Sequence, residues 1–261
     1  MRTLSTPSSC AGRSCLPGSG SGRVALVTGA SGEIGAEVAS QLLAHGVCVA
    51  LHYRSYRERL DIITEGHESD SYCEIQADLD HASGAKDLFD SVISWRERLD
   101  IVVNCAATVR GVPSLEMVDD ALLLESFRVN CVAPFLLAKW ACGPMRLHGW
   151  GRIVNVSSIG VKFAGTPQTA HYMISKAALE AATLALAKAV APDGILVNAV
   201  RAGVTRTSVH QRLGRDLRAR EELIPMKRAA EPSEIARVVL FLVSSMNTYL
   251  TGAVIPVAGG E

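Results

Sequence analysis

Short apolar runs alternate with amphipathic stretches along most of the chain. The runs contain little polar material, which is typical of strands that are buried on both faces of a sheet. Seven of them predict β-strands, at residues 24–27, 47–51, 72–76, 101–103, 153–156, 195–200 and 253–257. Repeated strand-then-helix order favours a mostly parallel sheet with helices on both faces. The pattern therefore predicts a doubly wound α/β fold.

The stretches between the runs have helical spacing. They predict helices from the glycine turn to His45, at 83–95, over 115–147 as one broken helix or two, at 172–191 and at 233–244. Ser83 and Ser233 stand where an N-cap is favoured, and Glu234 follows the second of them. In such a fold, ligands bind outside the carboxyl ends of the strands, where this chain places its polar groups.

The length of the chain fits one large α/β domain or two small ones. The chain has 261 residues, 48% of them hydrophobic, and equal numbers of acidic and basic residues. A net charge of zero argues against nucleic-acid binding by bulk electrostatics. No uninterrupted apolar run approaches the roughly 18 residues of a membrane helix. We predict one Rossmann domain over residues 23–261, with neither nucleic acid nor membrane as partner.

Residues 1–22 differ from the rest of the chain. They are rich in Ser, Gly, Pro and Cys, with two Arg and no acidic residue, and we predict a flexible tail. An organelle transit peptide is the alternative that this composition leaves open. The seven cysteines show no paired metal-ligand spacing, so no metal site is predicted. Their odd number favours a reducing compartment, and we predict the cytoplasm.

A glycine-rich turn follows the first predicted strand. It reads Thr-Gly-Ala-Ser-Gly-Glu-Ile-Gly from Thr28 to Gly35 and opens a helical segment. Strand, glycine turn and helix together favour a nucleotide site, because small residues let backbone N–H groups approach a pyrophosphate at a helix N-terminus. A tight turn without a ligand is the alternative.

The end of the second strand bears on the choice of cofactor. Folds that prefer NAD usually place a carboxylate here for the ribose 2′-hydroxyl, but no acidic residue occurs before Glu58. Arg54 and Ser55 instead offer a cation and a hydroxyl, which suit a 2′-phosphate. The sequence favours NADP(H) over NAD(H), although an arginine in solvent at a strand end is the alternative.

Candidate catalytic groups lie between Ser157 and Lys176. Tyr172 and Lys176 are four residues apart, so they share one face of a helix. A nearby ammonium is expected to lower the pKa of the phenol, and a serine hydroxyl from the preceding strand completes an oxyanion site. Ser157 and Ser158 are both candidates for this hydroxyl. An ordinary amphipathic helix carrying a Tyr and a Lys is the alternative.

Taken together, these motifs resemble the short-chain dehydrogenase/reductase family, particularly its 3-oxoacyl-carrier-protein reductases. The resemblance covers residues 24–260. It rests on an ordered series of motifs: Thr28-Gly29, Asp78-Leu79, Asn104, Asn130, Ser158, Tyr172 with Lys176, Asn198 with Gly203 and Thr207, and the segment from Thr251-Gly252 to Gly259-Gly260. The resemblance implies a seven-stranded Rossmann sheet and hydride transfer with NAD(P).

The resemblance also implies residue roles. Tyr172 would be the general acid toward a carbonyl oxygen, Lys176 would lower its pKa and bind the nicotinamide ribose, and Ser158 would hydrogen-bond the substrate oxygen. Asn130 would anchor a water that relays protons to Lys176. The implied cofactor-binding residues are Gly29, Ser31, Ile34, Gly35, Arg54, Ser55, Asp78, Leu79, Asn104, Ala106, Tyr172, Lys176, Gly203 and Thr207.

Four positions depart from the family pattern. Glu33 stands where the turn usually has its middle glycine, and the others are Ala107, Ala202 and Ala258. A carboxylate pointed at a pyrophosphate would repel it, whereas one at a helix start that faces solvent is mildly stabilising. We therefore expect Glu33 to face water. None of the four departures removes an implied catalytic group.

The implied reaction is the NADPH-dependent reduction of a ketone, of 3-oxoacyl or polyketide type, to a secondary alcohol, or the reverse. Its partner would be a small carbonyl or alcohol compound, free or carrier-bound. An epimerase or dehydratase on the same scaffold and a non-catalytic nucleotide sensor are the alternatives. Residues 204–227 are expected to form a substrate lid with many basic residues, which suit an anionic substrate or a solvated mobile helix. In the family that the chain resembles, the helix that matches the alanine-rich segment 172–191 builds a dimer face, which implies a homotetramer or homodimer. A helix buried within one subunit is the alternative.

Overall fold

Seven parallel strands form the centre of the molecule. The computed structural model describes residues 22–261, so the predicted tail lies almost wholly outside the described residues. The strand order is β3-β2-β1-β4-β5-β6-β7, and every neighbouring pair is parallel. The strands are β1 (Val24–Thr28), β2 (Cys48–Tyr53), β3 (Tyr72–Gln76), β4 (Ile101–Asn104), β5 (Gly151–Ser158), β6 (Ile195–Ala202) and β7 (Val254–Val257). The predicted doubly wound sheet is confirmed.

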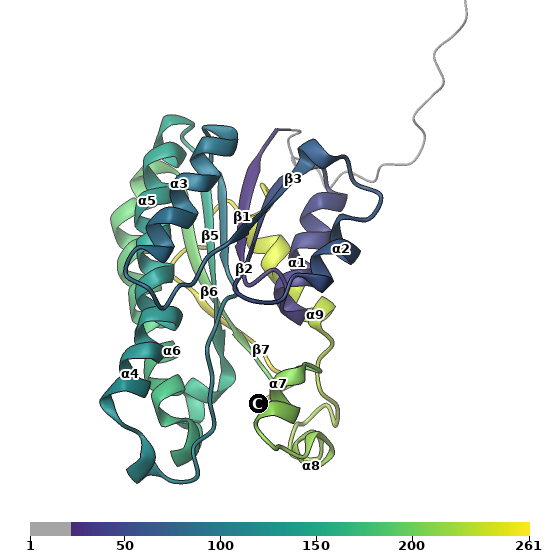
Figure 1. Cartoon of the computed structure of the whole chain (residues 1–261), viewed down its shortest axis with the longest axis vertical. Coiled ribbons are helices and arrows are strands. Elements are labelled where there is room, and N and C mark those ends of the chain that lie inside the picture. Colours follow the sequence, from purple (N-terminus) through teal and green to yellow (C-terminus); the bar gives the residue numbers. More distant parts are fainter. Residues whose placement is uncertain (1–21) are drawn as a thin grey trace, which may run out of the picture.

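Helices cover both faces of the sheet (Figure 1). On one side lie α3, α4, α5 and α6, and on the other lie α1, α2 and α9, while α7 and α8 lie below the strand ends. The helices are α1 (Glu33–Ala44), α2 (Glu58–Thr64), α3 (Gly84–Arg96), α4 (Asp120–Phe127), α5 (Ala133–Leu147), α6 (Ala170–Val190), α7 (Ser208–Arg212), α8 (Leu217–Glu221) and α9 (Pro232–Val243). The sequence pattern missed α2, α7 and α8, whose five to seven residues are too few to show a helical period.

Each central strand contributes to two separate cores. In β1, Leu26 packs into the core beneath α3, α5 and α6, whereas Ala25 and Val27 pack into the core beneath α1 and α9. This alternation follows from the period of two in a strand. Both faces of the strand need apolar side chains, which explains the uninterrupted runs in the sequence.

The chain reverses direction across the sheet between β1 and β4. It moves outward from β1 to β3 and then returns to add β4 on the other side of β1. The register pairs Thr28 with Asn104, so the ends of these two strands lie side by side. The Thr28 hydroxyl accepts a hydrogen bond of 3.1 Å from the Ala106 amide. A crevice forms at such a switch point, and this is where a ligand is expected.

Within residues 115–147, a short 3-10 turn at Leu115–Met117 is followed by one continuous helical run, Asp120–Leu147. Between α4 and α5 the run contains a π-helical segment, η3 (Arg128–Val132), which includes the buried Asn130. By length and composition alone, the run Asp120–Leu147 is long and apolar enough to cross a membrane. In the structure it packs on the sheet, and Leu137 and Met145 are fully buried. Its apolar character therefore also serves the core of the domain.

Two helix starts differ from the prediction. Ser83 occupies the N-cap position of α3, but its side chain makes no capping hydrogen bond. Helix α9 begins at Pro232, and its N-cap is Glu231 rather than Ser233. The Glu234 carboxylate accepts a hydrogen bond of 2.9 Å from the Glu231 amide. Proline suits the first helical position because it has no N–H to satisfy there, which moves the start of the helix back.

Candidate active site

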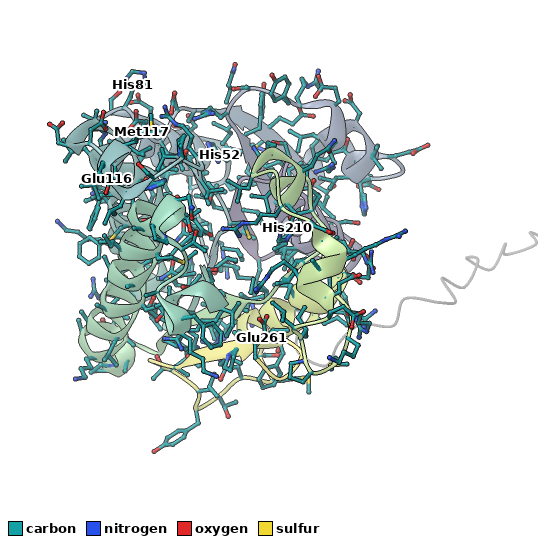
Figure 2. All side chains as sticks on the ribbon, turned by 90° about the horizontal axis from the view of Figure 1, so that it is seen from below. His52, His81, Glu116, Met117, His210 and Glu261 are labelled. Carbon is teal, nitrogen blue, oxygen red and sulfur yellow. The ribbon has the colours of Figure 1, made fainter. Side chains whose placement is uncertain are left out.

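A cavity of about 580 Å³ runs along the carboxyl edge of the sheet. Figure 2 looks at this edge from below, and it shows His52 and His210 toward its middle and His81 and Glu116 at the periphery. Ends of six strands, α6 and the lid segment (residues 204–227) contribute to the wall. The predicted site residues in the wall are Gly29, Ser31, Ile34, Gly35, Arg54, Ser55, Asp78, Leu79, Ala106, Ser158, Tyr172, Lys176, Gly203 and Thr207.

The glycine turn forms one end of the cavity. Gly29 has a φ of +67°, in the left-handed region that favours glycine. A Cβ on Gly35 would lie 2.2 Å from the Gly29 carbonyl oxygen, so only glycine lets α1 begin this close to the turn. The cradle fits a phosphate group, because the N-terminus of α1 meets a backbone surface that side chains do not cover.

His52 holds this turn in place, a role that the sequence analysis missed. Its Nδ1 accepts a hydrogen bond of 3.0 Å from the Gly29 amide, and its Nε2 lies 3.1 Å from the Ala77 carbonyl oxygen. Nδ1 is therefore the unprotonated nitrogen and Nε2 carries the hydrogen. The side chain is buried, and burial lowers the pKa of His52 to about 4, although Ala77 and Asp78 oppose this shift. His52 is a neutral hydrogen-bond bridge between the ends of β1, β2 and β3.

Glu33 is partly exposed, as expected, but its carboxylate also has protein partners that the sequence analysis did not foresee. Its carboxylate accepts a hydrogen bond of 3.0 Å from the Ser208 amide at the start of α7, and it lies 3.7 Å from the Arg59 guanidinium. Burial by itself would raise the pKa of Glu33. The hydrogen bonds from Ser208 and the charge of Arg59 outweigh burial, so the net effect is a lowered pKa. Glu33 thus ties the glycine turn to the lid segment, 175 residues away along the chain.

Basic and hydroxyl side chains gather at the outer end of the cavity. Arg54 and Ser55 are both exposed there, as predicted from the end of β2. Arg59, on α2, joins them and donates a hydrogen bond of 3.0 Å to the Ser31 carbonyl oxygen. The sequence analysis did not single out Arg59, because α2 was not predicted. The three side chains form a positive and hydroxyl-bearing surface beside the glycine turn.

The two neighbouring serines at the end of β5 have different environments. Ser157 is 2% exposed and donates a hydrogen bond of 2.7 Å to Glu180, which also binds Arg201 through two hydrogen bonds of 2.7 and 2.8 Å. The Ser158 hydroxyl accepts a hydrogen bond of 3.1 Å from the Gly160 amide and lies close enough to the Tyr172 phenol to lower its pKa. Ser158 is therefore the serine whose hydroxyl meets the phenol in the cavity.

Tyr172 and Lys176 lie on one face of α6, as their spacing predicts. The Lys176 ammonium is 5.8 Å from the centre of the Tyr172 ring and donates a hydrogen bond of 2.7 Å to the Val156 carbonyl oxygen. Burial raises the pKa of Tyr172 to about 12, although Ser158 and the charge of Arg215 both act to lower it. Burial also lowers the pKa of Lys176 to about 8. In the described structure the ammonium therefore does not pull the phenol pKa down, contrary to expectation, and the phenol holds its proton at neutral pH.

Asn130 and Asn104 lie behind the cavity wall and do not line it. The Asn130 amide exchanges hydrogen bonds of 2.8 and 2.9 Å with the Thr108 backbone and donates one of 3.0 Å to Ser175. It joins the loop after β4 to α6. The Asn104 amide donates a hydrogen bond of 2.8 Å to Asn155 in the core. The Asn104 side chain therefore points into the sheet interior, and its role in cofactor binding stays a prediction.

The fold and this site define a Rossmann-type dinucleotide oxidoreductase with a Ser-Tyr-Lys group. A family model described as enoyl-(acyl carrier protein) reductase matches residues 29–261. A 3-oxoacyl-[acyl-carrier-protein] reductase of Aquifex aeolicus is 34% identical over 92% of this chain and 97% of its own length. An acetoacetyl-CoA reductase of an Acinetobacter strain is 32% identical over 91% and 97%.

Solved structures agree with the curated relatives. The angucycline C-6 ketoreductase LanV with bound NADP superposes with a TM-score of 0.82 at 32% identity, covering 93% of this chain and 96% of that one. This chain belongs to the short-chain dehydrogenase/reductase family, and it is an NAD(P)-dependent oxidoreductase.

Proposed function

We propose that this protein reduces a ketone to a secondary alcohol with NADPH, and that it runs the reverse oxidation when product and NADP accumulate. One observation carries the proposal: the Ser158 hydroxyl and the Tyr172 phenol line the same cavity, close enough together for Ser158 to lower the pKa of the phenol. Two adjacent O–H groups are suited to receive one carbonyl oxygen. The ketoreductases among the relatives support the same reaction.

Several wall residues suit the nucleotide. The amides of the glycine turn and the N-terminus of α1 would hold the diphosphate, and Asp78 and Leu79 at the end of β3 would lie against the adenine side. When bound, the nicotinamide supplies the hydride. Lys176 extends from α6 behind Tyr172, where its ammonium would hydrogen-bond the ribose hydroxyls. Gly203 and Thr207 would close over the nicotinamide end from β6 and the lid segment.

The protein itself handles the proton. Tyr172 is protonated at neutral pH and would donate its proton to the carbonyl oxygen, while Ser158 orients that oxygen by a second hydrogen bond. Lys176, with a pKa of about 8, exchanges protons readily in the pH range in which enzymes work. Asn130 would support a proton relay to Lys176 by fixing the loop after β4 against α6, since its side-chain amide is already engaged.

The preference for NADPH rests on the positive surface at the outer end of the cavity. Arg54, Ser55 and Arg59 would receive a 2′-phosphate with charge-assisted hydrogen bonds. The NADP bound to the ketoreductase LanV supports this choice. Competition between NADPH and NADH in one assay tests it, and a clear preference for NADH would refute it.

We infer a 3-oxoacyl or polyketide-type ketone as the substrate, free or carrier-bound, by likeness to the acyl and aromatic ketone reductases among the relatives. The test follows the loss of reduced-nicotinamide absorbance with a panel of both ketone types. Tyr172→Phe should abolish turnover but leave NADPH binding within about threefold, because it removes the proton donor only. Binding of NADPH without turnover of any ketone in wild type would favour the nucleotide-sensing alternative.

For the assembly we propose a homotetramer that works in the cytoplasm. Exposed apolar side chains lie on two separate faces: Ile174 and Leu184 on α6, and Phe241 on α9 with Tyr249 just before β7. Two such patches suit two different two-fold interfaces. Light scattering checks this proposal: a monomer at micromolar concentration would refute it. A dimer would leave only one of the two faces as an interface.

A further inference from the structure

The lid segment brings one arginine into the catalytic end of the cavity. Arg215 lines the cavity together with Tyr172, and its side chain is half-buried. The two groups lie close enough for each to alter the other's ionisation: the Arg215 charge lowers the pKa of Tyr172, and Tyr172 raises that of Arg215. A guanidinium is always charged in a protein, so the catalytic phenol faces a permanent positive charge from the lid segment.

The backbone on both sides of Arg215 is fixed. Helix α7 ends in a Schellman motif: Gly214 has a φ of +62°, its amide binds the Gln211 carbonyl at 3.0 Å, and the Arg215 amide binds the His210 carbonyl at 2.9 Å. Asp216 then caps α8, and its carboxylate accepts hydrogen bonds of 2.9 Å from the Arg218 amide and 3.2 Å from the Ala219 amide. Arg215 is thus the one residue between the glycine that ends α7 and the residue that caps α8.

The guanidinium of Arg215 has no protein partner in the part of the chain that the structure describes. Two other lid arginines are paired: Arg206 lies 2.7 Å from Glu221 and 2.9 Å from Glu231, and Arg220 lies 3.2 Å from Glu261. Arg212 and Arg218 form no ion pair with the described residues either, but both are exposed to solvent, unlike Arg215. Arg215 makes no side-chain hydrogen bond or ion pair among residues 22–261, and Arg220 adds a second positive charge nearby. A half-buried, unpaired cation beside a catalytic group is costly unless a ligand supplies the counter-charge.

We propose that Arg215 binds a carboxylate of the substrate, so that the protein prefers a free keto acid to its neutral ester or thioester. This inference rests on the proposed ketone reduction and narrows its substrate class. The planar guanidinium matches a carboxylate through two parallel hydrogen bonds. The carboxylate takes no part in the chemistry: hydride adds to the ketone carbon, a proton adds to its oxygen, and the acid group leaves the site unchanged on the alcohol.

The experiment compares 3-oxohexanoate with methyl 3-oxohexanoate in wild type and in Arg215→Gln, Arg215→Lys and Arg218→Gln. Arg218 is the matched control, because it lies exposed on the same lid segment and does not line the cavity. In wild type the acid should have a KM lower than the ester by about tenfold or more, the usual effect of a charge-assisted hydrogen bond. Arg215→Gln should raise the KM of the acid by about the same factor and leave the ester within about threefold.

Arg215→Lys should recover part of the preference, since it keeps the charge but loses the planar fork. Arg218→Gln should behave as wild type with both substrates. Equal KM values for acid and ester in wild type would overturn the proposal. A fall in kcat on both substrates with a shifted pH profile in Arg215→Gln would also overturn it, because the arginine would then serve the phenol alone.

A binding measurement separates this proposal from the reductase proposal. The product 3-hydroxyhexanoate is titrated into the enzyme with NADP and its affinity is read without turnover. Weaker binding in Arg215→Gln than in Arg218→Gln supports the carboxylate site even if wild type reduced no ketone, and that inactivity would refute only the proposed reaction. Turnover of the ester together with equal binding of the acid by all four proteins would refute only the role of Arg215.

Discussion

Protonation of His52 should weaken both the fold and the glycine turn. The ring is a neutral bridge whose Nδ1 accepts from the Gly29 amide and whose Nε2 donates to the Ala77 carbonyl. Adding a proton to Nδ1 would turn the acceptor into a donor that faces another N–H group, in a buried site that disfavours charge.

The magnitude follows from the two pKa values. In the unfolded chain His52 has its ordinary pKa of about 6.5, and in the folded protein burial lowers it to about 4. Between these values the unfolded state binds more protons, so stability is complete above about pH 6.5 and falls as the pH drops toward 4. At about 1.4 kcal/mol per pKa unit, the loss reaches roughly 3 kcal/mol in full and about 2 kcal/mol by pH 5.

The assay measures the free energy of unfolding in denaturant for wild type, His52→Asn and His148→Asn across this pH range. Asparagine keeps an acceptor for the Gly29 amide and cannot titrate, and His148 is an exposed control at the end of α5. His52→Asn should be less stable than wild type near pH 7.5, and this gap should shrink by about 2 kcal/mol by pH 5. A gap that stays constant with pH, as expected for His148→Asn, would refute the reasoning.

Three further predictions concern the cavity wall. Gly35→Ala should abolish NADPH binding and cost several kcal/mol of stability, because the added Cβ is forced against fixed backbone. Gly143→Ala, whose added Cβ meets nothing beyond its own helix and chain neighbours, should leave NADPH binding unchanged and alter stability by less than about 1 kcal/mol; calorimetry and cofactor titration check both. Ser158→Ala should lower kcat by about 100-fold or more with little change in melting temperature. Ser157→Ala should chiefly lower the melting temperature, because it removes the hydrogen bond to Glu180. The reverse pattern would contradict the assignment of the two serines. Glu33→Gln should tighten NADPH binding by about fivefold at low ionic strength, and fluorescence titration that shows unchanged or weaker binding would contradict this.

The sequence alone predicted a structural feature correctly wherever a local pattern of residues is compatible with only one structure. The apolar runs had to be strands because both faces of the sheet are covered, and Leu26 and Val27 pack into opposite cores as that requires. The pair Tyr172 and Lys176 had to share a face because four residues make about one helical turn. The turn at Gly29 had to approach another backbone closely, and it approaches Ala106.

The contacts that the sequence analysis missed join distant parts of the chain. Glu33 meets Ser208 across 175 residues, and Arg59 reaches the glycine turn from a helix too short to show a period. His52 bridges the ends of three strands, a role that depends on the strand order. No spacing rule encodes such meetings. They appear only once the order of the strands and the path of the lid segment are known.

The ionisation of Tyr172 shows why a motif does not fix its own chemistry. The spacing to Lys176 correctly predicts that the two groups are neighbours, but the sign of the pKa shift depends on burial, which spacing does not report. Burial disfavours both the phenolate and the ammonium, so it raises the pKa of Tyr172 to about 12 and lowers that of Lys176 to about 8. Without ligands, the phenol is therefore a stored proton donor, as reduction requires. The oxidation direction needs a proton acceptor, so it depends on positive charge brought near the phenol, and Arg215 is the protein group already placed to contribute it.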